Sequence, residues 1–358
     1  MSRAWNFNAG PAVLPEEVLE QVKADLPEFG KSRASVMELS HRGKAYMAIH
    51  QEASANVRTL MGLPDSHAVL FLQGGASMQF AMVPRNLLAD GQTADYVHTG
   101  SWASKAIQEA KLVGRVNVAA DTSKERPCRI PKLSELKLTL GAAYVHLTSN
   151  ETIEGTQWME FPKTEAPLVA DMSSDILSRP IDAGRFALIY AGAQKNIGPA
   201  GVTLVIIRKD VAVRVSERVP KIFRYTTHIE EDSLYNTPPC FAIYVVALVT
   251  RWLLKQDGLE AIGARNRAKA QRLYGVIDSG FYRPTAAKEC RSQMNVTFRL
   301  PSEELETAFI AEAEAQGMTG LKGHRSVGGA RASIYNAMPP EGVEALVVFM
   351  QEFARRHG

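Results

Sequence analysis

The sequence contains few cysteines, and it lacks the patterns that cysteines form in secreted or metal-binding proteins. Its three cysteines, Cys128, Cys240 and Cys290, are far apart and form no CxxC pair. An odd number of scattered thiols argues against a disulfide framework and favours reduced thiols in a reducing compartment. We therefore expect a cytoplasmic protein whose fold is held by its core.

Long hydrophobic runs and charge of one sign are also missing. The most apolar helical stretch, residues 241–254, is shorter than the ~20 residues that cross a bilayer, and it includes Arg251. Residues 1–10 have no apolar core of signal-peptide length. The 41 basic and 38 acidic residues leave a net charge of only +3, without a lysine-rich run. These absences predict no membrane partner and no nucleic-acid partner.

What the sequence does contain is a regular alternation of apolar strands and helices. A chain of 358 residues, 46% of them apolar, can bury a large core and form more than one lobe. Expected helices lie between several of the strands, for example at 78–88 and 104–113. Such alternation predicts an α/β fold with a mostly parallel sheet between helices. The expected strands are 68–72, 94–99, 115–119, 142–147, 168–171, 187–191 and 202–207.

The pattern changes after residue 258. A long polar helix is expected at 259–277, then a strand at 293–300, a helix capped by Ser302, and a last helix at 340–356. We therefore predict a large domain over residues 16–258 and a smaller α/β domain over residues 259–358, joined by the N-terminal segment 1–15.

Lys195 is the first candidate for chemistry. It stands between two apolar strands, in a loop of Gly, Ala and Pro residues. Loops at strand ends are common catalytic positions in open α/β sheets. A desolvated lysine amine can form a Schiff base with an aldehyde. The alternative is an ordinary solvated loop lysine.

Asp171 is the second candidate, because it ends the expected strand 168–171 and can project into the same crevice. Pyridoxal 5′-phosphate (PLP) needs such a carboxylate, which keeps the pyridine nitrogen protonated so that the ring can draw electrons. The alternative is an aspartate that caps a helix or a turn.

Two further segments have the composition of a cofactor site. Residues 73–77 are rich in small residues between a strand and a helix, which lets backbone N–H groups approach a phosphate. A tight strand–helix turn is the alternative. Trp102 begins the next strand–helix unit, where its flat ring could stack on a cofactor or pack in the core.

Cationic residues gather in two short segments. His41-Arg42 is one pair, His324-Arg325 is the other, and Arg331 follows closely. Arg grips carboxylates and phosphates through paired donors, so these residues suit a substrate with several negative charges. Solvated surface charge is the alternative. No metal-ligand spacing, nucleophile elbow or dinucleotide fingerprint competes with this set, and we expect no metal.

Taken together, these segments resemble the phosphoserine aminotransferase family, in the class V group of fold-type I PLP-dependent transferases. The similarity extends nearly from end to end, with the matching blocks in the family's order. The blocks are residues 7–12, 38–42, 150–155, 193–201, 235–239 and 331–337.

The resemblance implies a role for each candidate. Lys195 would hold PLP and move the substrate proton, while Asp171 and Trp102 would contact the ring's nitrogen and face. The remaining cofactor contacts would come from Ala76, Ser77, Thr152 and Gln194, and from Asn236 and Thr237 of a neighbouring subunit, which implies a homodimer. Arg331 would bind the substrate's α-carboxylate. The second anionic group would lie among His41, Arg42, His324 and Arg325.

The implied reaction is reversible amino transfer between glutamate and 3-phosphohydroxypyruvate, which gives 2-oxoglutarate and O-phospho-L-serine for L-serine biosynthesis. A phosphorylated hydroxythreonine of pyridoxine biosynthesis is a further hypothetical substrate. This chain departs from some members at Ser77, where they have arginine, and at Ala9, where they have serine.

Two rival interpretations stay open. Another class V activity, such as amino transfer from serine to glyoxylate or removal of sulfur from cysteine, would keep the fold. Desulfuration needs a cysteine on a loop near the substrate, and none of the three fits. A silent binding protein would have lost the lysine or the aspartate, and both are present.

Overall fold

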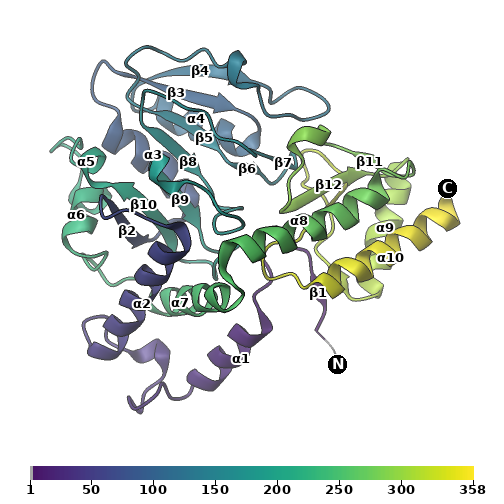
Figure 1. Cartoon of the computed structure of the whole chain (residues 1–358), viewed down its shortest axis with the longest axis horizontal. Helices are drawn as coiled ribbons and strands as arrows, with labels where there is room; N and C mark the ends of the chain where they lie inside the picture. Colours follow the sequence, from purple (N-terminus) through teal and green to yellow (C-terminus); the bar gives the residue numbers. More distant parts are fainter. Residues whose placement is uncertain (1–2) are drawn as a thin grey trace.

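A seven-stranded sheet forms the centre of the larger part of the molecule (Figure 1). The computed structural model describes residues 3–358. All strand pairs are parallel except the two pairs that involve β10, so the predicted mostly parallel sheet is confirmed. In spatial order the strands are β2 (His67–Leu72), β10 (Thr203–Arg208), β9 (Phe186–Gly192), β8 (Leu168–Asp171), β5 (Val145–Thr148), β3 (Thr93–His98) and β4 (Arg115–Asp121).

Helices cover both faces of this sheet, because alternate residues of each strand point to opposite sides. In β2, Val69 and Phe71 join one apolar cluster, with α2 (Lys44–Met61) and α7 (Cys240–Lys255). Leu70 and Leu72 join the other cluster, with α3 (Gly75–Leu87) and α4 (Ser101–Lys111). Every residue of β8 and β9 is buried, which explains their continuous apolar runs.

A smaller unit contains most of the C-terminal chain (Figure 1). Its antiparallel sheet has the order β11 (Arg283–Pro284), β12 (Asn295–Arg299) and β14 (Ala330–Ser333). The helices α8 (Gly258–Ile277), α9 (Glu303–Ala315) and α10 (Pro340–His357) pack around a third apolar cluster that also includes Phe7. Near the N-terminus, β1 (Trp5–Asn6) pairs with β13 (Met318–Thr319).

Helix α8 spans the two units. Leu259 and Ile262, near its start, pack in a cluster of the large sheet, whereas Leu273 and Ile277 pack in the cluster of the small unit. This packing supports the proposed division near residue 258, which stays a proposal.

The remaining elements are short. The α-helices α1 (Glu16–Asp25), α5 (Lys209–Ala212) and α6 (Tyr225–Glu230) lie in the larger unit, and β6 (Asn150–Glu151) pairs with β7 (Thr156–Gln157). Single 3₁₀ turns occur at Val36–Glu38, Leu133–Glu135, Ala183–Arg185, Lys221–Phe223 and Lys288–Cys290. Across residues 3–358, no helix is both long and apolar enough to cross a membrane.

Three expected boundaries were wrong by three residues, and several others differ by one or two. Helices α3 and α4 each begin three residues earlier than predicted, and the strand expected from residue 142 begins at Val145. The two helices follow Gly74 and Gly100, and the backbone N–H groups of α4 find acceptors in a distant part of the chain, which local sequence cannot reveal. The predicted cap of α9 is confirmed, since the Ser302 hydroxyl accepts from Leu305 N at 3.3 Å.

Lys269 holds the segment that follows β14. Its buried Nζ donates to the carbonyl oxygens of Ile334, Tyr335 and Met338 at 2.7, 2.7 and 2.9 Å. Burial lowers the pKa of Lys269 well below its usual value. Only the ammonium form has enough N–H groups for these three acceptors, so the geometry favours the charged state.

We expect Lys269→Met to lower the free energy of unfolding by about 3 kcal/mol, because three buried carbonyl oxygens lose their donor at about 1 kcal/mol or more each. Urea denaturation measures the change. Lys255→Met, at an exposed position of α7, is the control and should change stability little. Equal effects of the two substitutions would contradict this role for Lys269.

Candidate active site

The carboxyl ends of β8 and β9 bring the two leading candidates to one edge of the sheet. Asp171 is the last residue of β8, and Lys195 follows the end of β9 at Gly192 by three residues. The strands are parallel neighbours, with Asp171 opposite Tyr190. Desolvation lowers the pKa of Lys195, and the charge of Asp171 opposes this shift, so the two side chains are close enough to interact electrostatically.

Asp171 is held rigidly and is only 4% exposed. Its Oδ1 accepts from the backbone N–H and the hydroxyl of Ser173, at 2.9 and 2.6 Å. The same hydroxyl accepts from Gly192 N at 3.1 Å, which ties the end of β8 to the end of β9. Burial raises the pKa of Asp171, while Lys195 and the Ser173 bonds oppose this shift.

Lys195 lies over an aromatic face. Its Nζ is 5.0 Å from the centroid of the Trp102 ring, a cation–π distance. Desolvation lowers the pKa of Lys195 below its usual value, and the nearby charge of Arg331 lowers it further, while Asp171 and Glu151 act in the opposite direction. An amine with a lowered pKa has a larger neutral, nucleophilic fraction near neutral pH.

Thr152 connects the Trp102 indole with Arg331 through two hydrogen bonds. Trp102 Nε1 donates to Thr152 Oγ1 at 2.9 Å, and Arg331 Nη1 donates to the Thr152 carbonyl oxygen at 3.1 Å. Burial lowers the pKa of Arg331, opposed by Tyr335 and Glu154. Arg331 Nε is buried and has no partner among the described residues, so it can serve as a donor to a ligand.

Two carboxylates beside Thr152 were missed by sequence reasoning. Glu151 accepts from the backbone N–H groups of Trp102 and Ala103, and Glu154 accepts from Ser101 N and Oγ. In the sequence, both stand within the block 150–155 that resembles the family. The sequence signal for their role is weak. It consists of two acidic residues three positions apart and a helix start at Gly100 that has no capping side chain of its own.

Small residues form a turn at the start of α3. Gly74 and Gly75 have φ angles of 84° and 63°, so the chain can turn sharply into the helix. Ala76 and Ser77 lie in its first turn, where backbone N–H groups lack intrahelical acceptors. Such a terminus is suited to an anion. Gln194 lies next to Lys195, with its amide close enough to Gly192 to exclude a side chain there.

The other cofactor candidates do not reach Lys195 within one chain. Asn236 and Thr237 are exposed. The Thr237 carbonyl oxygen accepts from Gln73 Nε2 at 3.3 Å, so these residues lie beside the turn that leads into α3. Within residues 3–358, neither makes a hydrogen bond to Lys195 or Asp171.

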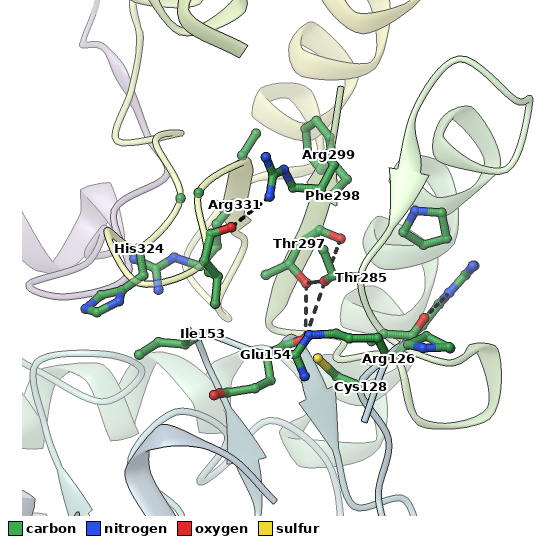
Figure 2. Close-up of a pocket in the computed structure, with 18 of the residues that line it drawn as sticks. Arg126, Cys128, Ile153, Glu154, Thr285, Thr297, Phe298, Arg299, His324 and Arg331 are labelled. Carbon is green, nitrogen blue, oxygen red and sulfur yellow. Dashed lines mark hydrogen bonds between the residues drawn. The ribbon is translucent and has the colours of Figure 1, made fainter. Parts of the chain in front are cut away.

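His324 of the second His-Arg pair lines a cavity of about 660 Å³ between the two units, whereas the neighbouring Arg325 is exposed and does not line it. Figure 2 shows His324, Arg331 and Glu154 at this cavity, where the Thr285 and Thr297 hydroxyls bond the Glu154 carbonyl oxygen. Burial and the charges of Arg331, Arg325 and Lys105 lower the pKa of His324.

The first His-Arg pair is far from these groups in the sequence. Half-buried His41 and exposed Arg42 precede α2, and no ion pair joins them to the other site residues in the described chain. Residues 3–358 contain no cluster of three His, Cys, Asp or Glu residues that could hold a metal ion.

The pKa of Lys195 gives a direct prediction. In the cofactor-free protein, we expect amine labelling of Lys195, followed by peptide mass spectrometry over pH, to have its midpoint below that of exposed Lys255 in the same sample. Asp171→Asn should move the midpoint lower still, because the removed negative charge stabilises the ammonium form. A Lys195 midpoint at or above that of Lys255 would refute this account.

Comparisons with known proteins agree with this geometry. The family model described as aminotransferase class V matches residues 4–346. The phosphoserine aminotransferases of Desulfatibacillum aliphaticivorans and Niallia circulans are 57% and 55% identical to the chain, over 100% and 99% of its length and 99% of each relative.

Solved structures give the same result. That of phosphoserine aminotransferase from Bacillus circulans subsp. alkalophilus matches with a TM-score of 0.96 at 54% identity, covering 99% of both chains. The PLP-bound phosphoserine aminotransferase from Trichomonas vaginalis matches with a TM-score of 0.94 at 40% identity, over 98% of this chain and 100% of that one. The fold predicted from the sequence is confirmed, and the chain belongs to the class V aminotransferase family.

Proposed function

We propose that the protein transfers the amino group between glutamate and 3-phosphohydroxypyruvate, with PLP as cofactor, and so forms O-phospho-L-serine for serine biosynthesis. The observation that carries this proposal is the identity of 55–57% to phosphoserine aminotransferases over essentially the full length. The cluster of Lys195, Asp171, Trp102 and Thr152 supports it independently.

The residues present fit PLP. Asp171 offers a buried carboxylate whose hydrogen bonds within the described chain all go to Oδ1. Its Oδ2 can therefore accept a hydrogen bond from a protonated pyridine nitrogen. Trp102 presents a ring face, and the start of α3 at Ala76 and Ser77 suits the phosphate, with Gln194 beside it. When bound, PLP supplies an electron sink for the carbanion formed at the substrate's Cα. Lys195 is the base that removes and returns the Cα proton, helped by its lowered pKa.

Substrate recognition would divide between two sets of cations. Arg331, half-buried and oriented by the Thr152 carbonyl oxygen, would bind the α-carboxylate. His324, Arg325, His41 and Arg42 would bind the phosphate or the distal carboxylate. One cationic pocket then serves both substrates in turn, which predicts ping-pong kinetics. Because Ser77 stands where some relatives have arginine, these residues would carry the phosphate binding.

We further propose a homodimer that completes each site. Asn236, Thr237 and Arg42 are exposed in the single chain, as expected of residues that reach a neighbouring subunit. Thr237 also lies near the turn at Gln73, so a two-fold contact could exchange these segments between sites. A cytoplasmic location stays a prediction.

The substrate proposal predicts phosphate dependence. The PLP form of the protein should react with O-phospho-L-serine at least about 100-fold faster than with serine at equal subsaturating concentration, because the charged phosphate contacts are lost with serine. Stopped-flow absorbance of the cofactor in the single half reaction measures both rates.

Lys195→Ala should stop the half reaction and serves as the control for specific chemistry. Equal rates with phosphoserine and serine would remove the claim of a phosphorylated substrate. The same assay with 4-phosphohydroxythreonine tests the pyridoxine hypothesis.

The dimer proposal predicts complementation. Lys195→Ala and the double variant Asn236→Ala/Thr237→Ala should each be weakly active alone. If the sites are shared, subunit exchange at equal amounts should restore about a quarter of wild-type activity, because half the dimers carry one intact site. Activity after mixing that does not exceed the sum of the separate variants would contradict sharing.

A further inference from the structure

Helix α4 begins without a capping side chain of its own. Its N-cap residue is Gly100, which makes no side-chain cap bond, and no acidic residue occupies its first turn. The first N–H groups of a helix have no intrahelical acceptor and carry the positive end of the helix dipole. These groups therefore need an acceptor from elsewhere in the chain.

Glu151 and Glu154 supply that acceptor from about 50 residues away. Glu151 Oε2 accepts from Trp102 N at 3.1 Å, and its Oε1 accepts from Ala103 N at 3.0 Å and from Thr99 Oγ1 at 3.4 Å. Glu154 Oε1 accepts from Ser101 N at 2.9 Å. Glu151 is completely buried, so these bonds form away from water.

Gly100 makes room for this arrangement. A Cβ at this position would lie 2.5 Å from Glu154 Cδ and 2.8 Å from Glu151 Cδ. Since the backbone of Gly100 is extended, with φ at 175°, space rather than conformation requires glycine here. The helix start is thus shaped around two carboxylates.

This cap bears directly on the site because Trp102 is held at two points. Its backbone N–H bonds Glu151, and its indole Nε1 bonds Thr152, the next residue along the chain. We propose that Glu151 is a positioning residue for amino transfer: it fixes Trp102, whose ring centroid lies 5.0 Å from Lys195 Nζ, over the cofactor ring. This inference rests on the proposed function for the identity of the cofactor.

The same backbone N–H groups also affect the titration of Glu151. Burial and the neighbouring Glu154 raise the pKa of Glu151, while the N–H groups of Trp102 and Ala103 oppose that shift. The charge of Glu151 in turn raises the pKa of Lys195. The backbone N–H groups of Trp102 and Ala103 can only donate, so each of the two carboxyl oxygens of Glu151 serves as an acceptor.

Glu151→Gln tests the proposal with little change in shape. Glutamine has one acceptor oxygen, so it must turn an N–H donor toward one of the two backbone N–H groups. We expect the dissociation constant for PLP, measured by quenching of protein fluorescence, to rise about tenfold. Ser302→Ala is the matched control: it removes a helix cap in the small unit and should leave PLP binding within about twofold.

A double-mutant cycle with Trp102→Phe separates positioning from general stability. If Glu151 acts through Trp102, adding Glu151→Gln to Trp102→Phe should raise the dissociation constant much less than tenfold. A full tenfold rise in that background, or no rise in the wild-type background, would overturn the proposal. Tm values of all variants show whether each protein is folded.

Gly100→Ala provides a second route if Glu151→Gln folds poorly. It should displace both carboxylates while leaving them in the sequence, and we expect it also to weaken PLP binding by several fold. Unchanged PLP binding in a folded Gly100→Ala protein would count against the proposal. Since the readout is cofactor binding, failure of phosphoserine turnover would refute the proposed substrate and leave this test intact.

Discussion

The site depends on one constraint, the burial of a polar segment between the two units. Residues 150–157 are all buried, although most of them are polar. Buried polar groups are costly unless they are hydrogen-bonded, so this segment must find partners on every side. Asn150 bonds Ser174 of the large unit and Asn295 of the small unit, at 2.8 and 2.7 Å. Thr152 and Glu151 bond Trp102. The hydrogen bonds that these buried polar groups make therefore fix the geometry of the site.

The titration of Lys195 depends on the charged groups that are buried around it. Asp171 and Glu151 raise the pKa of Lys195, while desolvation and Arg331 lower it. A lysine without nearby carboxylates would lose its proton more readily, and one fully paired with them would be a poor base. The arrangement balances the two requirements, since the amine must hold a proton at one stage of amino transfer and give it up at another.

The sequence could predict those parts of the fold and site that depend on local pattern. Strands such as 168–171 and helices such as 340–356 follow from apolar periodicity, and Lys195 and Asp171 follow from their positions at strand ends. The start of α4 could not be predicted, because its cap comes from Glu151 and Glu154, far along the chain. The roles of Asn236, Thr237, His41 and Arg42 came from family resemblance, and no hydrogen bond or ion pair of the described chain joins them to Lys195.

Hydrogen bonds also join the two units at the residue next to Lys195. The backbone N–H of Asn336 donates to Asn196 Oδ1 at 2.9 Å, and its side-chain amide donates to the Leu177 carbonyl oxygen at 2.8 Å. Lys269 holds the flanking carbonyl groups of residues 334, 335 and 338. Asn196 neighbours Lys195, and β14, which carries Arg331, leads into this segment. A rotation of the small unit would have to break these buried bonds, so the separation of Lys195 from Arg331, the proposed carboxylate-binding residue, is set by the interface itself. The substrate's α-carbon must therefore fit between Lys195 and Arg331 at this fixed separation. The difference between a phosphate and a carboxylate must then be accommodated where the distal group of the substrate binds.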